Sequence, residues 1–278
     1  MDGFELSYDD RPGDGGVVVL LHGWPGDRHD YRAVVPLLAG RRVVVPDLRG
    51  FGETTAPADA PPTEFGAEGQ ARSVIALIEA VADGPVVLGG YDVGSRTSQA
   101  LARARPDLVR GLVVSPPVPG VGSRILAPDP VREFWYQSFH RLPLAEQLLD
   151  GSRVAVRAYL EHFWTHWSGP DYVPEAAELD RLAEAYGRSG AFVASINWYR
   201  GGSGSVARAL AEETPDPADR LAPPTTLLWP EYDPLFPRAW ADRVHDWFAN
   251  AQLQPVDGVG HFVPVEAPEA FAEAILSH

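Results

Sequence analysis

Asp92 stands between two glycines in a segment whose residue types favour a nucleophile. Residues 89–95 read GGYDVGS and follow the apolar run Val86–Leu88. Glycines at 90 and 94 allow the tight strand-to-helix turn that exposes a reactive side chain. The helix expected from Ser95 onward points its positive end at this turn, which favours an ionised carboxylate. We therefore predict that Asp92 holds the position of the serine in the G-x-S-x-G turn.

An aspartate nucleophile implies a different reaction from that of a serine. Its carboxyl group, with a reference pKa of about 3.9, is already ionised at neutral pH and needs no base. A carboxylate can displace a leaving group from a saturated carbon and form an alkyl-enzyme ester. Water would then attack the carbonyl carbon of that ester. Asp92 therefore predicts cleavage of a C–O or C–halogen bond at an sp³ carbon.

A histidine and an acid follow later apolar runs, in the order that the partners of such a nucleophile take. Asp233 comes after Thr225–Trp229, and His261 lies in the glycine-rich loop after Leu253–Val256. The chain order is nucleophile, acid, histidine. We predict that His261 activates water and that Asp233 orients the imidazole and stabilises its charged form. Glu231 is the alternative acid.

The HGWPG segment, residues 22–26, follows the apolar run Val17–Leu21 and predicts one side of an oxyanion hole. We assign one donor to the backbone N–H of Trp24 and the other to the N–H of Val93. Both would stabilise the negative charge that develops on the ester carbonyl oxygen when water attacks. The bond between Trp24 and Pro25 is a candidate for the cis form.

Short apolar runs alternate with helical patterns and predict the elements that position these residues. We expect strands at residues 4–8, 17–21, 43–45, 86–88, 112–114, 225–229 and 253–256. Helices are expected near residues 31–38, 70–81, 95–104, 237–248 and 268–277. Continuous apolar strands separated by helices predict an α/β protein with a mostly parallel, doubly wound sheet. Ligands bind such sheets beyond the carboxyl ends of the strands, where the motifs lie.

The strand pattern stops between about residues 119 and 221. Aromatic-rich helical stretches replace it, at residues 131–149, 155–167, 176–186 and 191–199. We therefore predict a core made of residues 1–118 and 222–278, with residues 119–221 inserted as a helical cap. The cap aromatics indicate an apolar pocket for a small, hydrophobic substrate.

Composition excludes several classes of function. The 278 residues contain no cysteine and no lysine, which removes disulfides, thiolate metal ligands and Schiff-base chemistry. A formal net charge of −15 opposes binding to nucleic acid or an anionic membrane. No apolar run approaches the length of a membrane span, and the first residues lack a signal-peptide pattern. We expect a cytoplasmic enzyme with no cofactor and no metal, and leave open whether it forms a homodimer.

The motifs together resemble the epoxide hydrolase branch of the α/β-hydrolase superfamily, which is related to the haloalkane and haloacetate dehalogenases. The resemblance covers nearly the whole chain: the HGWPG loop, the PDLRGFG segment at 46–52, the G-x-D-x-G turn, the cap and the histidine loop. It implies the α/β-hydrolase fold. Residues 197–200, NWYR, are similar to a cap segment of soluble epoxide hydrolases in which the tyrosine donates to the epoxide oxygen. The resemblance thus implies that an epoxide is opened to a vicinal diol, with Tyr199 as a donor.

The second cap tyrosine of that family has no direct match. The spacing to residues 139–140 puts Trp135 in its place, directly before Tyr136. The indole N–H of Trp135 can donate a hydrogen bond but cannot protonate an alkoxide. Tyr136 takes the role instead if the register shifts by one residue. A Trp–Tyr pair also holds the departing halide in haloacetate dehalogenases, whereas Phe134 replaces the histidine of their halide site.

A hydrolytic dehalogenase acting on a haloacid such as fluoroacetate is the alternative function, with the same aspartate nucleophile. Haloacetate dehalogenases carry one arginine directly after the nucleophile and another three residues later, and only the second is present, as Arg96. Arg96 could clamp a carboxylate or form a structural ion pair. Val93 also replaces the tryptophan that follows the nucleophile in haloalkane dehalogenases. A non-catalytic ligand-binding protein on this fold is a further alternative, but all three triad positions are filled.

Overall fold

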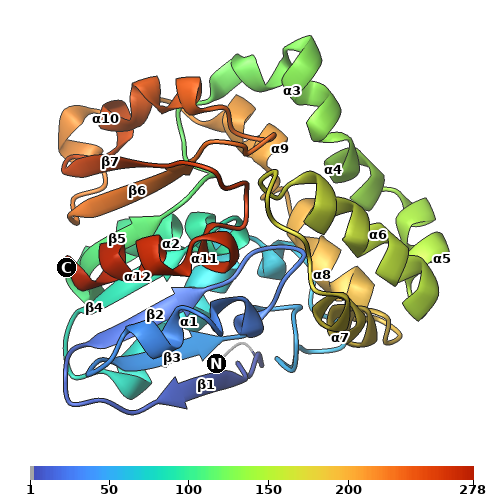
Figure 1. Cartoon of the computed structure of the whole chain (residues 1–278), viewed down its shortest axis with the longest axis horizontal. Helices are drawn as coiled ribbons and strands as arrows, with labels where there is room; N and C mark the ends of the chain where they lie inside the picture. The colour runs from blue at the N-terminus through green and yellow to red at the C-terminus, as the bar shows by residue number, and fades with distance from the viewer. Residues whose placement is uncertain (1–2) are drawn as a thin grey trace.

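A seven-stranded sheet forms the centre of the computed structural model, which describes residues 3–278 (Figure 1). The spatial order is β1-β3-β2-β4-β5-β6-β7. Only β1 is antiparallel to its neighbour among the strand pairs of residues 3–278. The predicted α/β class with a mostly parallel sheet is confirmed. The strands are β1 (Tyr8–Arg11), β2 (Val17–Leu21), β3 (Arg42–Pro46), β4 (Val86–Gly90), β5 (Val109–Val114), β6 (Thr225–Pro230) and β7 (Ala251–Val256).

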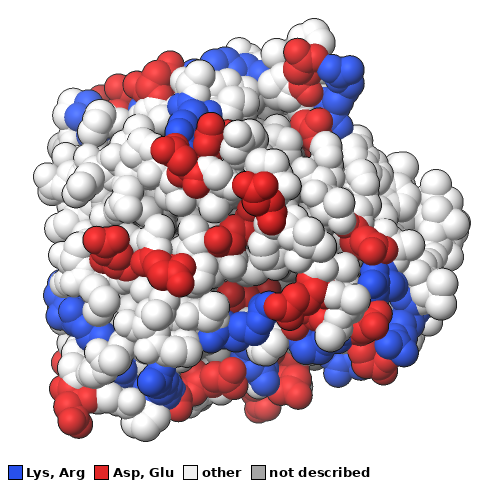
Figure 2. Space-filling view, in the orientation of Figure 1, with Lys and Arg blue, Asp and Glu red and all other residues white. Residues whose placement is uncertain are grey.

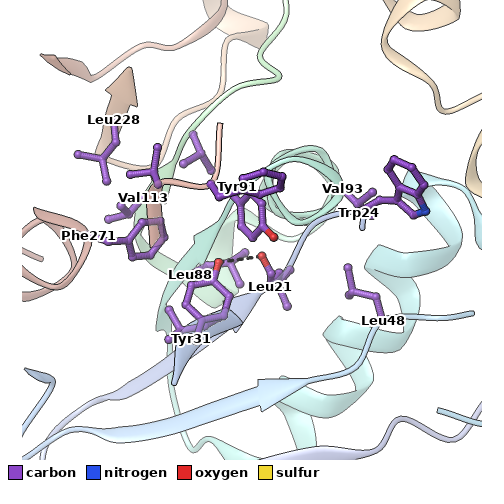
Figure 3. Packing of buried hydrophobic residues seen from close by; sticks show 14 of the residues in the cluster. Leu21, Trp24, Tyr31, Leu48, Leu88, Tyr91, Val93, Val113, Leu228 and Phe271 are labelled. Atoms are coloured by element: carbon purple, nitrogen blue, oxygen red, sulfur yellow. Dashed lines mark hydrogen bonds between the residues drawn. The ribbon is translucent and has the colours of Figure 1, made fainter. Parts of the chain in front are cut away.

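The central strands are buried because helical segments cover both faces of the sheet. Helices α1 (Ala67–Val81) and α2 (Val93–Ala104) pack together on one face, and α12 (Pro268–Leu276) lies on the other (Figure 1). Every residue of β4 is buried, which explains its continuous apolar run. On the α12 face, the ring of Tyr31 packs against Phe271, and its hydroxyl donates to the carbonyl of Leu21 at 2.9 Å (Figure 3).

Three predicted elements of the core differ from the structure. The first strand is Tyr8–Arg11, and the expected strand at 4–8 contributes only an isolated bridge from Glu5 to Thr55. The helix expected at 31–38 is replaced by two 3₁₀ turns, Arg28–Tyr31 and Val35–Leu37. The helix expected at 237–248 is a 3₁₀ turn, Arg238–Arg243, followed by the short α10 (Val244–Trp247). Short α11 (Val263–Glu266) and 3₁₀ turns at Pro62–Phe65 and Pro106–Leu108 complete the core, and a further 3₁₀ turn, Pro217–Asp219, lies near the end of the inserted segment.

The segment between β5 and β6 is helical, and we call residues 119–221 the cap. It begins with a 3₁₀ turn, Gly122–Leu126, and then contains α3 (Pro128–Glu133), α4 (Trp135–His140), α5 (Pro143–Leu149), α6 (Arg153–His166), α7 (Ala176–Tyr186), α8 (Ala191–Arg200) and α9 (Ser205–Ala211). The single helix expected over 131–149 is three short ones, and Pro143, which has no N–H to continue a helix, accounts for the break between α4 and α5. Figure 1 shows α3 to α8 beside the sheet at the end toward which the parallel strands run.

The surface carries mixed charge. On the face shown in Figure 2, acidic and basic side chains are interspersed rather than gathered into one continuous patch of either sign. No helix within residues 3–278 combines the length and the apolar character needed to cross a bilayer.

Candidate active site

Asp92 occupies a strained turn between β4 and α2. Its φ of 49° and ψ of −118° lie in a region that non-glycine residues rarely adopt, at a cost of about 1–3 kcal/mol. The second glycine of the turn, Gly94, lies close to the backbone of β2. A Cβ on Gly94 would lie 1.9 Å from the carbonyl oxygen of Leu21, so no larger residue fits. The strain is retained because this turn presents the carboxylate at the N-terminus of α2.

His261 lies between two carboxylates. Its Nδ1 is 2.9 Å from Oδ2 of Asp233, and its Nε2 is 3.3 Å from Oδ2 of Asp92. The other oxygen of Asp233 accepts backbone N–H groups of Leu235 at 2.8 Å and Phe236 at 3.3 Å. All three members of this triad are buried. The structure therefore brings together Asp92, His261 and Asp233 with each carboxylate held in place.

The two carboxylates control the charge of His261. Burial disfavours the charged imidazole, but the attraction of Asp233 and hydrogen bonds to Asp233 and Asp92 outweigh burial and raise the pKa of His261 to about 10. While Asp92 is an ionised carboxylate, the imidazole is therefore protonated at neutral pH. Loss of the charge on Asp92 would remove part of this stabilisation and lower the pKa of His261.

The sequence assigned an oxyanion-hole donor to Trp24, and the structure places this residue against Asp92. Its backbone N–H donates to Oδ1 of Asp92 at 2.8 Å. The bond to Pro25 is cis. Within the 22–26 loop, the His22 side chain contacts backbone on both of its ring nitrogens. Its Nε2 accepts the N–H of Leu48 at 3.0 Å, and its Nδ1 lies 3.0 Å from the carbonyl oxygen of Gly23. The N–H of Val93, the first residue of α2, has no partner within the helix and lies next to Asp92 in the chain.

Side chains of the cap bind residues 25–27 of this loop, through contacts that sequence reasoning missed. Nε1 of Trp164 donates to the carbonyl of Pro25 at 3.2 Å, and the hydroxyl of Tyr186 donates to that of Gly26 at 2.6 Å. Arg181 binds both oxygens of Asp27, at 2.7 and 2.9 Å. The partners are more than 130 residues apart in the chain, so no local pattern could have revealed them.

Two cap tyrosines lie near Asp92. Tyr136 from α4 and Tyr199 from α8 pack edge to face, with ring centroids 5.5 Å apart. Burial raises the pKa of both hydroxyls, and the nearby charge of Asp92 raises them further. Nε2 of Gln137 also donates to the hydroxyl oxygen of Tyr136 at 3.1 Å. Both tyrosines are therefore neutral at physiological pH and can donate hydrogen bonds.

Trp135 does not join this pair, and its assignment as the second donor is corrected to Tyr136. The Trp135 side chain is 45% exposed and stacks on Phe163, with ring centroids 6.0 Å apart. Successive helical residues point about 100° apart, so α4 can direct only one of Trp135 and Tyr136 at the site. Tyr136 is 2% exposed and its ring stacks parallel to that of Trp24 at 5.7 Å.

The remaining candidates have structural partners. Nη1 of Arg96 lies 2.7 Å from Oε1 of Glu212, and its Nη2 donates to the carbonyl of Val118 at 3.2 Å. Arg96 thus forms the structural ion pair that was the alternative to a substrate clamp. Phe134 is buried against Phe236, 5.7 Å between centroids, behind the loop of the triad acid. Glu231, the reserve acid, accepts the N–H of Gly258 and does not contact His261. Within residues 3–278 no cluster of His, Cys, Asp or Glu fits a metal ion.

Comparisons with known proteins agree on the fold. The family model described as alpha/beta hydrolase fold matches residues 16–268. A soluble epoxide hydrolase from Corynebacterium sp. strain C12 is 28% identical over 284 residues, which cover 99% of this chain and 94% of that protein. Epoxide hydrolase srdG from Neurospora crassa is 26% identical, over 91% of this chain and 83% of its own. The solved structure of epoxide hydrolase CorEH without ligand has a TM-score of 0.80, 26% identity, and coverage of 99% and 94%.

Proposed function

The chain belongs to the α/β-hydrolase fold family, and from this premise we propose that it hydrolyses a small hydrophobic epoxide to a vicinal diol through a covalent ester on Asp92. One observation carries the proposal: a carboxylate stands at the nucleophile turn, bound on Oδ1 by the Trp24 N–H and facing His261 with Oδ2. Relatives named as epoxide hydrolases, similar over nearly their full length, support the substrate class.

In the first step, Oδ2 of Asp92 attacks one oxirane carbon, and the bond from that carbon to the epoxide oxygen breaks. The electron pair of the broken bond leaves with the oxygen as an alkoxide. A hydroxyl of the Tyr136–Tyr199 pair donates to this oxygen and gives it a proton. Solvent carries the proton of His261 back to the resulting tyrosinate. The products are a hydroxyalkyl ester of Asp92 and a neutral imidazole.

In the second step, His261 removes a proton from water while the water oxygen bonds to the ester carbonyl carbon. His261 gave up its proton in the first step and is a neutral base at this stage, and esterification has removed the Asp92 charge that favoured the protonated form. Oδ1 takes the negative charge; the N–H of Trp24 already donates to this oxygen, and the N–H of Val93 is the second donor. Collapse of the intermediate breaks the bond to the alkyl oxygen, which takes a proton from His261 and leaves as the diol. The carboxyl proton then returns to His261.

Haloacid dehalogenation is not favoured by the geometry. It requires a cation to hold the substrate carboxylate, and Arg96 is already paired with Glu212. The test measures diol formation from a panel of aryl epoxides together with halide release from chloro- and fluoroacetate, for wild type and Asp92→Ala. Diol from the wild type alone is expected. Halide release without diol would overturn the proposal in favour of dehalogenation.

A further inference from the structure

Glu266, at the end of α11, accepts three backbone N–H groups from two separate loops. Its Oε2 binds the N–H of Gly169 at 2.7 Å and that of Gly260 at 2.8 Å, and its Oε1 binds the N–H of Phe262 at 3.0 Å. Gly260 and Phe262 flank His261 on both sides. Gly169 belongs to the cap, just beyond the end of α6. One carboxylate therefore ties the histidine loop to the cap.

The two loops approach closely enough that neither glycine can carry a side chain. A Cβ on Gly260 would lie 2.2 Å from the carbonyl oxygen of Trp167, and one on Gly169 would lie 2.5 Å from that of Gly258. The N–H of His261 itself donates to the carbonyl of Trp167 at 2.7 Å. All three backbone N–H groups from residue 260 to 262 are therefore bound, two of them by Glu266.

The contacts of Trp167 show what this arrangement fixes. Its indole ring packs against the imidazole of His261, with centroids 5.2 Å apart, and against the ring of Tyr136 at the same 5.2 Å. Trp164, one turn earlier, stacks on Phe262 at 3.9 Å. A shift of the histidine loop relative to the cap would move the imidazole relative to both Asp92 and the cap tyrosines.

We propose that Glu266 is a positioning residue, which places the imidazole of His261 to remove a proton from water by binding the histidine loop to the cap. The proposal rests on the proposed function, in which His261 acts as base only in the second step. Glu266 touches no reacting atom and acts through the backbone of Gly260 and Phe262. Its loss should therefore slow hydrolysis of the Asp92 ester far more than formation of the ester.

The residue must be a carboxylate because both of its oxygens accept and neither donates. Glutamine has the same shape but offers one acceptor oxygen and one NH₂ group. In Glu266→Gln, either the N–H of Phe262 or the N–H pair of Gly169 and Gly260 loses its acceptor. An unpaired buried donor is unfavourable enough to move the loop, and we expect hydrolysis to slow about tenfold.

The test compares wild type, Glu266→Gln and the control Glu269→Gln, which changes an exposed carboxylate three residues later. Rapid quenching with intact-protein mass measurement gives the rates of ester formation and ester loss. In Glu266→Gln we expect formation within twofold of wild type, hydrolysis about tenfold slower and accumulation of the ester. The control should match wild type in both rates. Unchanged hydrolysis in Glu266→Gln, or an equal loss of both rates, would overturn the positioning role.

A measurement without substrate separates this proposal from the proposed function. The proton on Nδ1 of His261, hydrogen-bonded to Asp233, should give a low-field ¹H NMR signal. We expect it to shift and to exchange faster with solvent in Glu266→Gln, and to be unchanged in Glu269→Gln. An unchanged signal would overturn the role of Glu266. A wild type that forms neither ester nor diol would refute the proposed function, while the NMR comparison still decides the role of Glu266.

Discussion

The candidate active site has two sides that are built differently. On the core side, Asp92, His261 and Asp233 lie in loops after strands, and every carboxylate oxygen has a polar partner. On the cap side, Tyr136 and Tyr199 lie on helices and pack edge to face against each other. We propose that the core side takes part in both half-reactions, whereas the cap side serves only the first. Substitutions on the two sides should therefore have different kinetic signatures.

Replacing Asp92 should have the largest effect. Asp92→Ala removes the atom that forms the ester, so diol formation should fall by about 10³-fold or more. Steady-state diol production measures the loss, and circular dichroism checks that the variant is folded. A residual rate within tenfold of wild type would mean that water attacks the epoxide directly.

Replacing His261 should separate the two half-reactions. His261→Gln leaves the nucleophile and the cap tyrosines but removes the base, so turnover should fall by about 10²–10⁴-fold. The ester should accumulate and appear as a mass increase equal to one substrate molecule. Slow turnover with no trapped ester would place the role of His261 in the first step instead.

The cap tyrosines should affect ester formation alone. Tyr199→Phe and Tyr136→Phe each remove one hydroxyl donor, and we expect each to slow ester formation about 10²-fold with little change in ester hydrolysis. Trp135→Phe is the matched control from the same helix and should stay within twofold of wild type, because Trp135 is 45% exposed and its ring packs on Phe163 rather than on Tyr136 or Tyr199. The pre-steady-state rate of ester formation is the measurement. A large loss in Trp135→Phe would restore Trp135 as the donor.

The two sides of the site also differ in how well they could be predicted from the sequence. The core side was predictable because glycines, strand runs and chain order define the turns that carry Asp92, Asp233 and His261. The cap side was not, because a single residue of helix phase decides whether Trp135 or Tyr136 faces inward, and the short α4 carries no periodic pattern long enough to fix that phase. The role of Arg96 depended on Glu212, 116 residues away, and no local pattern predicts such a pair.

The smallest expected effect concerns stability at alkaline pH. The pKa of His261 is raised from 6.5 to about 10 in the folded protein, so its contribution to stability is fully present below about pH 6.5 and is lost as the pH rises through 10. The chain has no lysine or cysteine, so few other side chains titrate between pH 7 and 9.5. Over this range the free energy of unfolding of wild type should decrease.

Asp92→Asn gives this pH dependence a control. It removes one of the charges that raise the pKa of His261, so its free energy of unfolding should decrease less between pH 7 and 9.5 than that of wild type. Urea unfolding at several pH values measures both slopes. Parallel slopes would contradict the coupling between Asp92 and His261.

The most direct test of the central claim is a single turnover in H₂¹⁸O with enzyme in excess over epoxide. If Asp92 is the nucleophile, the new oxygen of the diol comes from its carboxylate, so the first diol is unlabelled and ¹⁸O enters the peptide that contains Asp92. Mass spectrometry of the diol and of that peptide reads out both. A labelled diol from the first turnover, with Asp92 unlabelled, would contradict the covalent mechanism.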